Sequence, residues 1–500
     1  MELDLPRRTN RPLTVVSLLL GLFLAAMEMT VVSTAMPTAV GDLGGIHLYA
    51  WVFAAYMLTA TVTLPIYGKL ADLYGRKPVM LVGIALFLGG SFLCGHAGSM
   101  NTLILFRAIQ GLGAGAIQPI AMTIVGDLFD VHQRARIQGI LGAVWGLAGL
   151  IGPVLGGAIV HWLSWRWVFY VNIPLGIGCA AVLIFAYHEK VERQNHRLDF
   201  AGAALLSCAV VLALLAARSR AEGLGFLPAA AVALALFLWV ERRAEEPLLP
   251  LDLFSQRVMA VSSATGALVG AAMISVVTFV PLYVQSVLAG SPTDAGTAIA
   301  PIAIGWPISS TLAGRILPRT GYRTLIRGGL ALTFCAALGL SFLLRPGADL
   351  WSLRLTMFFY GLGLGFANTP LIIAVQSSVP WKRRGVATAS TMFSRSIGGT
   401  LAVGVLGGVL AAALAAGGAP LGAVDKLLGP ERSFLPPALV RSLSVALQGG
   451  MEGIFQTVAV IAFAGFAVSL LFPAIRIAPR SSTTAEAPPD GRAKERHEYE

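Results

Sequence analysis

Long apolar runs separated by short charged segments recur along the whole 500-residue chain. Runs of roughly 18 residues or more can cross a ~30 Å hydrocarbon core as α-helices, and helices satisfy their own backbone polar groups in lipid. The pattern predicts fourteen spans, and an even number places both termini on one side of the membrane. The predicted spans are residues 13–36, 49–67, 79–97, 102–126, 137–160, 167–187, 199–217, 226–240, 258–282, 295–316, 324–344, 351–376, 385–412 and 452–475.

Two charged segments, 246 residues apart, indicate an internal repeat. Segment 68–77 holds one Asp, two Lys and one Arg between apolar runs, and we expect it to be a loop at a membrane face. Segment 314–321 repeats its seven-residue step between glycines but has Pro318 in place of Asp72. The glycines of 111–115 recur at 361–365. Parallel repeats of this kind are an architecture of transporters.

The predicted fold is therefore an all-α integral membrane protein, in which two six-helix bundles are parallel repeats and two further helices link them. The predicted divisions are a cytoplasmic N-terminus (1–12), an N-terminal bundle (13–190), a linker helix pair (191–257), a C-terminal bundle (258–477) with an extracytoplasmic loop (414–451), and a disordered cytoplasmic tail (478–500).

Composition excludes a soluble globule, because 56% of the residues are hydrophobic and only 12% are charged. The net charge of +11 follows the topology: 25 of the 36 Lys and Arg fall on the side of the N-terminus and 8 on the other. The positive-inside rule makes that side cytoplasmic, so we expect a multi-pass protein of the cell (inner or plasma) membrane, with the lipid bilayer and not nucleic acid as its partner. The dominance of Arg over Lys indicates a bacterial origin. The four cysteines lie in apolar runs, and no metal site is predicted.

Two ionisable residues lie deep in predicted spans. Glu28 lies in the first, where a charge costs ~2.5–3.5 kcal/mol and usually has a function. We expect it to bind a proton or a cation, with a structural hydrogen bond as the alternative. Arg107 lies in the fourth span with Gln110 and Gln118. For Arg107, two roles are equally open: a part in coupling, or a buried structural partner. That it pairs with Glu28 is a hypothesis.

Small residues follow one another at helical spacing in the fifth span. We expect Gly142, Gly146, Gly149, Pro153 and Gly156 to lie three or four residues apart on one flank, which would allow close helix packing. Pro153 removes a backbone hydrogen bond and bends the helix. By composition alone this is only a packing surface.

Four motifs together resemble the major facilitator superfamily, and within it the fourteen-span drug:proton antiporters. They are segments 68–77, 107–111, 142–157 and 165–174. The resemblance implies export of lipophilic, cationic drugs in exchange for protons by alternating access, with Arg107 in proton coupling. It also implies an inner-gate loop and an antiporter helix. The loop residues are Gly68, Asp72, Gly75 and Arg76, with Asp127 at the end of the fourth span; the antiporter helix residues are Gly142, Gly146, Gly149, Gly152, Pro153, Gly156 and Gly157.

The energy source and the substrate site are also expectations. No Gly-x4-Gly-Lys-Ser/Thr pattern occurs, so we expect no ATP and no cofactor, only the transmembrane proton gradient. Aromatic and amide side chains within the spans are candidates to line a cavity for a small lipophilic substrate, although ordinary packing is the alternative for each. They are Tyr56, Gln110, Gln118, Trp145, Phe279, Tyr283, Trp306 and Asn368.

Two other functions stay open at this point. The chain could export one endogenous metabolite, lipid or siderophore, or it could be a non-transporting membrane receptor or scaffold. An enzyme is not expected, because no nucleophile–base pair or metal-ligand cluster stands out. The oligomeric state is open, and a monomer is compatible with the pattern.

Overall fold

The computed structural model describes residues 9–129, 131–189, 199–218, 225–245, 247, 249–343, 349–380, 383–417 and 420–474. Within these ranges the secondary structure is helical. The elements are α1 (Arg11–Leu43), η1 (Ile46–Leu48), α2 (Tyr49–Tyr74), α3 (Arg76–Gly95), α4 (Met100–Leu128), α5 (Val131–Trp162), α6 (Trp167–Tyr170), α7 (Asn172–Ala186), α8 (Phe200–Arg218), α10 (Phe226–Glu241), η2 (Leu251–Ser255), α11 (Arg257–Ser286), α12 (Pro292–Leu343), α13 (Leu350–Ser378), α14 (Arg384–Ala416), α15 (Leu421–Leu428), η4 (Pro430–Phe434) and α16 (Pro437–Ser469).

The described part of the chain contains eleven helices that are long and apolar enough to cross a membrane. The predicted all-α membrane class is confirmed at this level. Two shorter apolar helices, Ala201–Ala216 and Phe226–Glu241, fall in the predicted linker. The count of fourteen spans, the two six-helix bundles and the division boundaries stay predictions.

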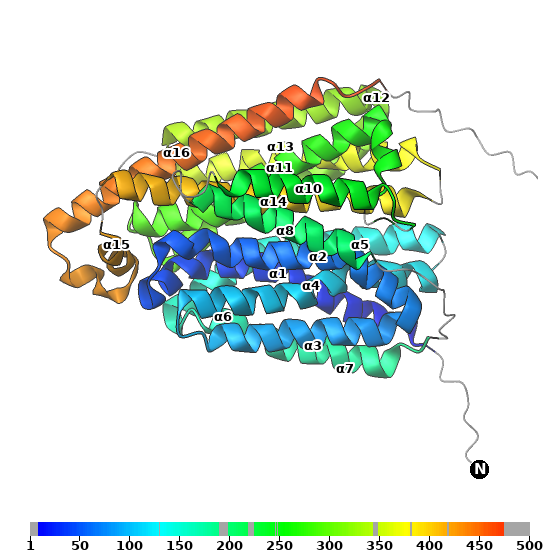
Figure 1. Cartoon of the computed structure of the whole chain (residues 1–500), viewed down its shortest axis with the longest axis horizontal. Helices are drawn as coiled ribbons and strands as arrows, with labels where there is room; N and C mark the ends of the chain where they lie inside the picture. Colours follow the sequence, from blue (N-terminus) through cyan, green and yellow to red (C-terminus); the bar gives the residue numbers. More distant parts are fainter. Residues whose placement is uncertain are drawn as a thin grey trace, which may run out of the picture.

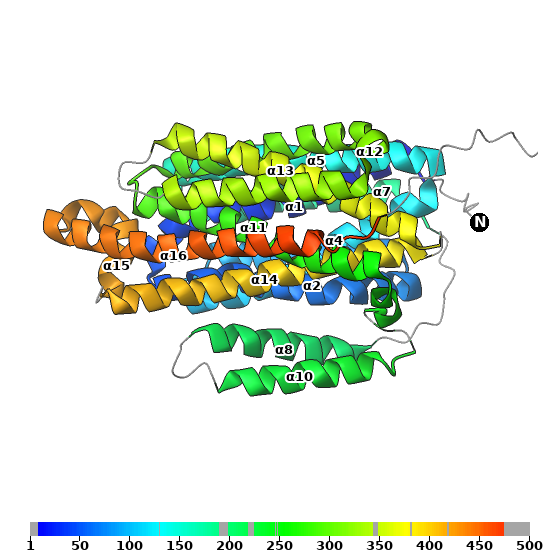
Figure 2. The same ribbon diagram turned by 90° about the horizontal axis from the view of Figure 1, so that it is seen from above.

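The long helices lie side by side along one axis of the molecule (Figure 1). Helices α8 and α10 form a separate pair beside the other helices (Figure 2). Leu206 and Leu214 of α8 pack with Leu58 of α2 and Phe393 of α14. The linker pair is therefore attached to a helix of each sequence half.

The predicted loop 68–77 is wrong in its extent, because α2 continues through it to Tyr74. Only Gly75 breaks the helix, with φ 96°, and α3 begins at the next residue. Helical hydrogen bonding continues to this point, since the Gly75 N–H donates to the Ala71 carbonyl at 3.0 Å. A positive φ strains other residues but not glycine, so one residue makes the turn.

The repeat reproduces this turn at Gly321, 246 residues after Gly75. Gly321 has φ 78° inside α12, whose 52 residues it divides into two helices. An uninterrupted helix of that length would measure roughly 78 Å, more than twice the ~30 Å hydrocarbon core. The turn therefore allows α12 to cross a membrane twice. We call the end of the molecule where α2 turns into α3 the Gly75 end, and the opposite end the α15 end (Figure 1).

Helix packing repeats as well. In α4, Gly113 lies against the Gly83 carbonyl of α3; in α13, Gly363 lies against the Gly329 carbonyl of α12. An added Cβ at either glycine would clash with backbone. Gly83 and Gly329 are themselves 246 residues apart, so the same close contact is built twice.

Segment 414–451, predicted as a loop, is largely helical where it is described. It contains the end of α14, then α15 and η4, and α16 begins at Pro437. Proline at the first helical turn is favourable because its missing N–H would have no partner there. The segment extends beyond the other helices in Figure 1.

Candidate functional site

A buried ion pair joins α1 to α4. Glu28 and Arg107 are 0% and 1% exposed, and Arg107 Nη1 contacts Glu28 Oε1. The same Nη1 donates to Gln110 Oε1 at 2.6 Å. Burying two charges is tolerable only when they are paired and hydrogen-bonded, and here both conditions hold. The pairing hypothesised from the sequence is present.

Asn172 and Ser91 complete this polar cluster, and sequence reasoning missed both. Asn172 Nδ2 donates to Glu28 Oε2 and, at 2.9 Å, to Ser91 Oγ. Ser91 Oγ also accepts from Gln110 Nε2 at 3.0 Å and donates to the Phe169 carbonyl. The cluster of Glu28, Arg107, Gln110, Ser91 and Asn172, here called the Glu28 cluster, therefore links α1, α3, α4 and α7.

Aromatic rings and a backbone carbonyl surround the Arg107 guanidinium. Its Cζ lies 4.1 Å from the centroid of the Tyr56 ring and 5.9 Å from that of Phe169. Its Nε donates to the Val52 carbonyl at 3.3 Å. A cation over an aromatic face is stabilised by about 2 kcal/mol when desolvated. Arg107 would thus keep several partners if Glu28 lost its negative charge.

The other residues predicted to line a cavity are dispersed. Phe279 and Tyr283 are buried in α11, where Phe279 packs on Tyr49 and Tyr283 on Phe455. Trp145 is 38% exposed on α5. The remaining predicted positions are partly buried: Gln118 on α4, Trp306 on α12, and Asn368 on α13, which accepts from Arg395 at 3.5 Å.

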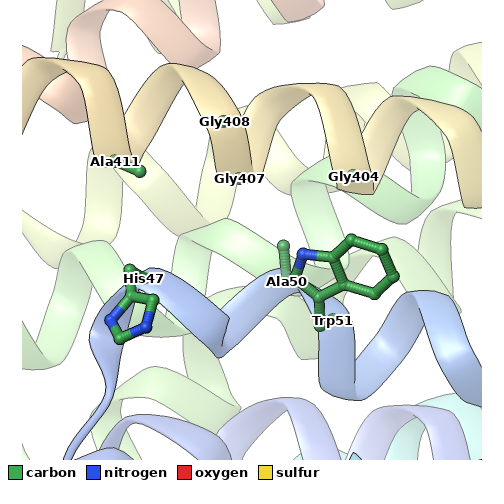
Figure 3. A pocket seen from close by; sticks show the side chains of 7 residues that line it. All are labelled: His47, Ala50, Trp51, Gly404, Gly407, Gly408 and Ala411. Carbon is green, nitrogen blue, oxygen red and sulfur yellow. The ribbon is translucent and has the colours of Figure 1, made fainter. Parts of the chain in front are cut away.

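A pocket of about 190 Å³ lies between α2 and α14, towards the α15 end. Figure 3 shows His47 and Trp51 beside the glycine-rich face of α14. The lining residues are His47, Ala50, Trp51, Gly404, Gly407, Gly408 and Ala411. None of the residues predicted to line a cavity is among them.

At the Gly75 end, charged groups hold the start of α3. Arg76 Nε lies 3.1 Å from Asp127 Oδ2, so the structure joins two of the predicted inner-gate residues. Glu189, which the sequence did not single out, accepts from the Arg76 and Lys77 N–H groups at 2.9 and 2.8 Å. A carboxylate at a helix N-terminus satisfies free donors and opposes the helix dipole. The Asp72 side chain lies outside the described residues.

The small residues of α5 lie on two flanks, not on one. Gly152 packs on Thr30 of α1, while Gly149 packs on Ala303 of α12. The same division continues along the helix. Gly156 packs on Thr34 and Val31 of α1. Gly146 and Gly157 pack on Pro307 and Pro292 of α12, and the Pro153 carbonyl contacts Gly296 of α12. Gly142 lies outside the residues whose surroundings are described. Helix α5 is therefore packed closely between a helix of each half.

Comparison with known proteins agrees with this architecture. The Major Facilitator Superfamily model matches residues 18–403. The chain is 35% identical to multidrug resistance protein 3 of Bacillus subtilis (strain 168), covering 97% of this chain and 99% of that protein. It is 37% identical to the multidrug transporter protein MdtP of the same organism, over 81% of this chain and 76% of that one. Among solved structures, a bacterial homologue of the human lysosomal transporter Spinster, inward-facing and unoccupied, gives a TM-score of 0.68 at 16% identity, covering 93% of this chain and 98% of that one. The chain belongs to the Major Facilitator Superfamily, a family of membrane transporters and not of enzymes.

Proposed function

We propose that this transporter exports lipophilic, cationic compounds in exchange for protons, driven by the transmembrane proton gradient and without a bound cofactor. The observation that carries the proposal is the Glu28 cluster, a buried carboxylate held by a buried guanidinium. Ionisable groups in this setting usually serve ion or substrate pathways. The two Bacillus subtilis relatives, named as a multidrug transporter and a multidrug resistance protein, support the choice of drugs as substrates.

The proposed coupling step follows from the contacts of Glu28. A proton on Glu28 cancels the charge that Arg107 faces, so the buried ion pair becomes a weaker contact between a cation and a neutral acid. Helix α1 would then lose part of its attachment to α4. Thr30, two residues beyond Glu28, packs on Gly152 of α5, and α5 in turn packs on α12. Protonation inside one half would thereby change the contact between the halves, as alternating access requires.

The proposed topology has fourteen spans, with both termini and the Gly75 end in the cytoplasm. Two crossings by α12 and one each by α8 and α10 would bring the count from eleven to fourteen. Lys69, Arg76 and Lys77 near Gly75 and Arg323 near Gly321 place positive charge at this end, as the positive-inside rule requires of a cytoplasmic face. The proposed location is the bacterial cell membrane.

Transport into inside-out vesicles tests the proposal. Under an imposed pH gradient, vesicles with the wild-type chain should accumulate ethidium, a lipophilic cation, and dissipating the gradient should abolish uptake. Glu28→Gln keeps the shape of the side chain but removes its charge, and should reduce gradient-driven uptake at least tenfold. Glu431→Gln is the matched control, because Glu431 is 58% exposed and exposed pairs contribute little.

Three results would count against the proposal. Gradient-driven uptake that is unchanged in Glu28→Gln would remove Glu28 from coupling. Uptake of one compound only, out of a panel of unrelated dyes, would identify a dedicated exporter. Absence of any gradient-dependent flux would indicate a receptor or scaffold.

A further inference from the structure

Two carboxyl groups outside the Glu28 cluster meet where the linker helices come together at the Gly75 end. Asp199 precedes α8, and its Oδ1 accepts from the Gly202 N–H at 2.8 Å. Glu241 is the last residue of α10, and its Oε1 accepts from the Leu249 N–H. Each carboxyl group therefore uses one oxygen to hold backbone, Asp199 in the first turn of α8 and Glu241 in the segment that follows α10.

The second oxygens of the two groups converge. Asp199 Oδ2 and Glu241 Oε2 are buried and have no hydrogen-bond donor among the described residues. Glu241 as a whole is 3% exposed. A Cβ at Gly202 would lie 3.1 Å from Glu241 Oε2 and still closer to Asp199 Oδ2, so both oxygens lie over one glycine that leaves room for them. The second oxygens of the two carboxyl groups therefore face the same buried space above Gly202.

A hydrogen bond between these two oxygens would require a proton. An ionised carboxylate has only acceptors, so two of them cannot hydrogen-bond to each other. Like charges in contact at a buried site also favour retention of one proton between them. Among the described residues outside the linker pair, Lys69 of α2, in the charged segment 68–77, places a positive charge near Glu241.

We propose that Asp199 and Glu241 form a proton-binding site that holds the ends of the linker helices together beside α2. Binding transfers one proton from solvent at the Gly75 end to the pair, and the charge of the pair changes from −2 to −1. Loss of the proton leaves two adjacent carboxylates, which would separate the start of α8 from the end of α10. The site is distinct from Glu28, and in the proposed topology it responds to cytoplasmic pH.

Infrared difference spectroscopy on the purified full-length chain tests for this proton. Wild type should show a carbonyl stretching band of a buried, protonated carboxylic acid that disappears as the pH is raised, in buffer free of alkali metal ions. Glu241→Gln and Asp199→Asn should each abolish that band. Glu245→Gln should keep it, because Glu245 is exposed in the same segment. Glu28→Gln should also keep it, so the result does not depend on the proposed function.

Two outcomes would overturn the proposal. With Glu28→Gln as the common background, so that Glu28 contributes no band, a band that persists in both Glu241→Gln and Asp199→Asn belongs to another group. A spectrum that responds to added sodium at constant pH, but not to pH in its absence, identifies a metal-cation site. Size-exclusion chromatography shows whether each variant is folded, and if one variant does not fold, the other still tests the proposal. As a functional readout, the dependence of ethidium transport on pH at the Gly75 end should be lost in Glu241→Gln and unchanged in Glu245→Gln.

Discussion

Removing the Asp425 carboxylate should release a contact that ties the two halves together at the α15 end. Asp425 lies on α15, in the C-terminal half, and accepts from the Gly45 and Ile46 N–H groups between α1 and α2, both at 2.9 Å. The backbones of Gly41 and Gly429 touch beside it. The proposed alternating access requires the two halves to separate at this end in the opposite state.

The size of the effect follows from the two hydrogen bonds. A hydrogen bond to a charged group contributes about 1.5–3 kcal/mol. Because Asp425 is partly exposed, we take about 2–3 kcal/mol as the amount by which the two hydrogen bonds together stabilise the closed state. Asp425→Ala should then shift the equilibrium roughly 30- to 150-fold away from the state closed at the α15 end. Asp425→Asn keeps one acceptor oxygen and should give a smaller shift.

Spin labels report the separation directly. Trp162 is the last residue of α5 and Trp351 is the second residue of α13, both at the α15 end on different halves, and they are 77% and 71% exposed. Labels at these positions, with the exposed Cys208 and Cys335 replaced by Ser, should show a longer distance population that grows from wild type to Asp425→Asn to Asp425→Ala. An identical distance distribution in all three would refute the view that Asp425 holds this end closed.

Three further predictions concern single contacts. Asn172→Leu removes the amide donor to the buried carboxylate of α1, so the pH profile of ethidium transport should move while the amount of folded protein in the membrane changes little. Gly296→Ala places a Cβ on the Pro153 carbonyl, and should lower the thermal unfolding temperature or abolish transport, whereas Gly328→Ala, with nothing within 4 Å of the added Cβ, should do neither. Glu189→Ala removes the acceptor for two N–H groups at the start of α3, and should cost about 0.5–2 kcal/mol, measured as a lower midpoint of thermal unfolding.

The sequence predicted the apolar runs and the repeat because both depend on hydrophobicity and glycine spacing. It did not predict the extent of α2, since charged residues at a membrane face remain helical when the backbone can continue to Gly75. It also did not single out Asn172 as a partner of Glu28, or Glu189 as a cap. Each binds a residue distant in the chain, at sequence separations of 144 and 113, and such partners depend on tertiary packing and not on local pattern.

The two repeats share their packing but not their charges, and this difference places the proposed coupling chemistry in one half. When the two repeats are aligned on Gly111 of α4 and Gly361 of α13, the position that corresponds to Arg107 is Met357. Met357 is fully buried and apolar, whereas Arg107 carries a charge at the same depth. An ion pair that changes with protonation can therefore alter α1 and α4 without an equal change in the second half. Because α5 packs on α1 on one flank and on α12 on the other, a change confined to α1 and α4 would act on one flank of α5 alone.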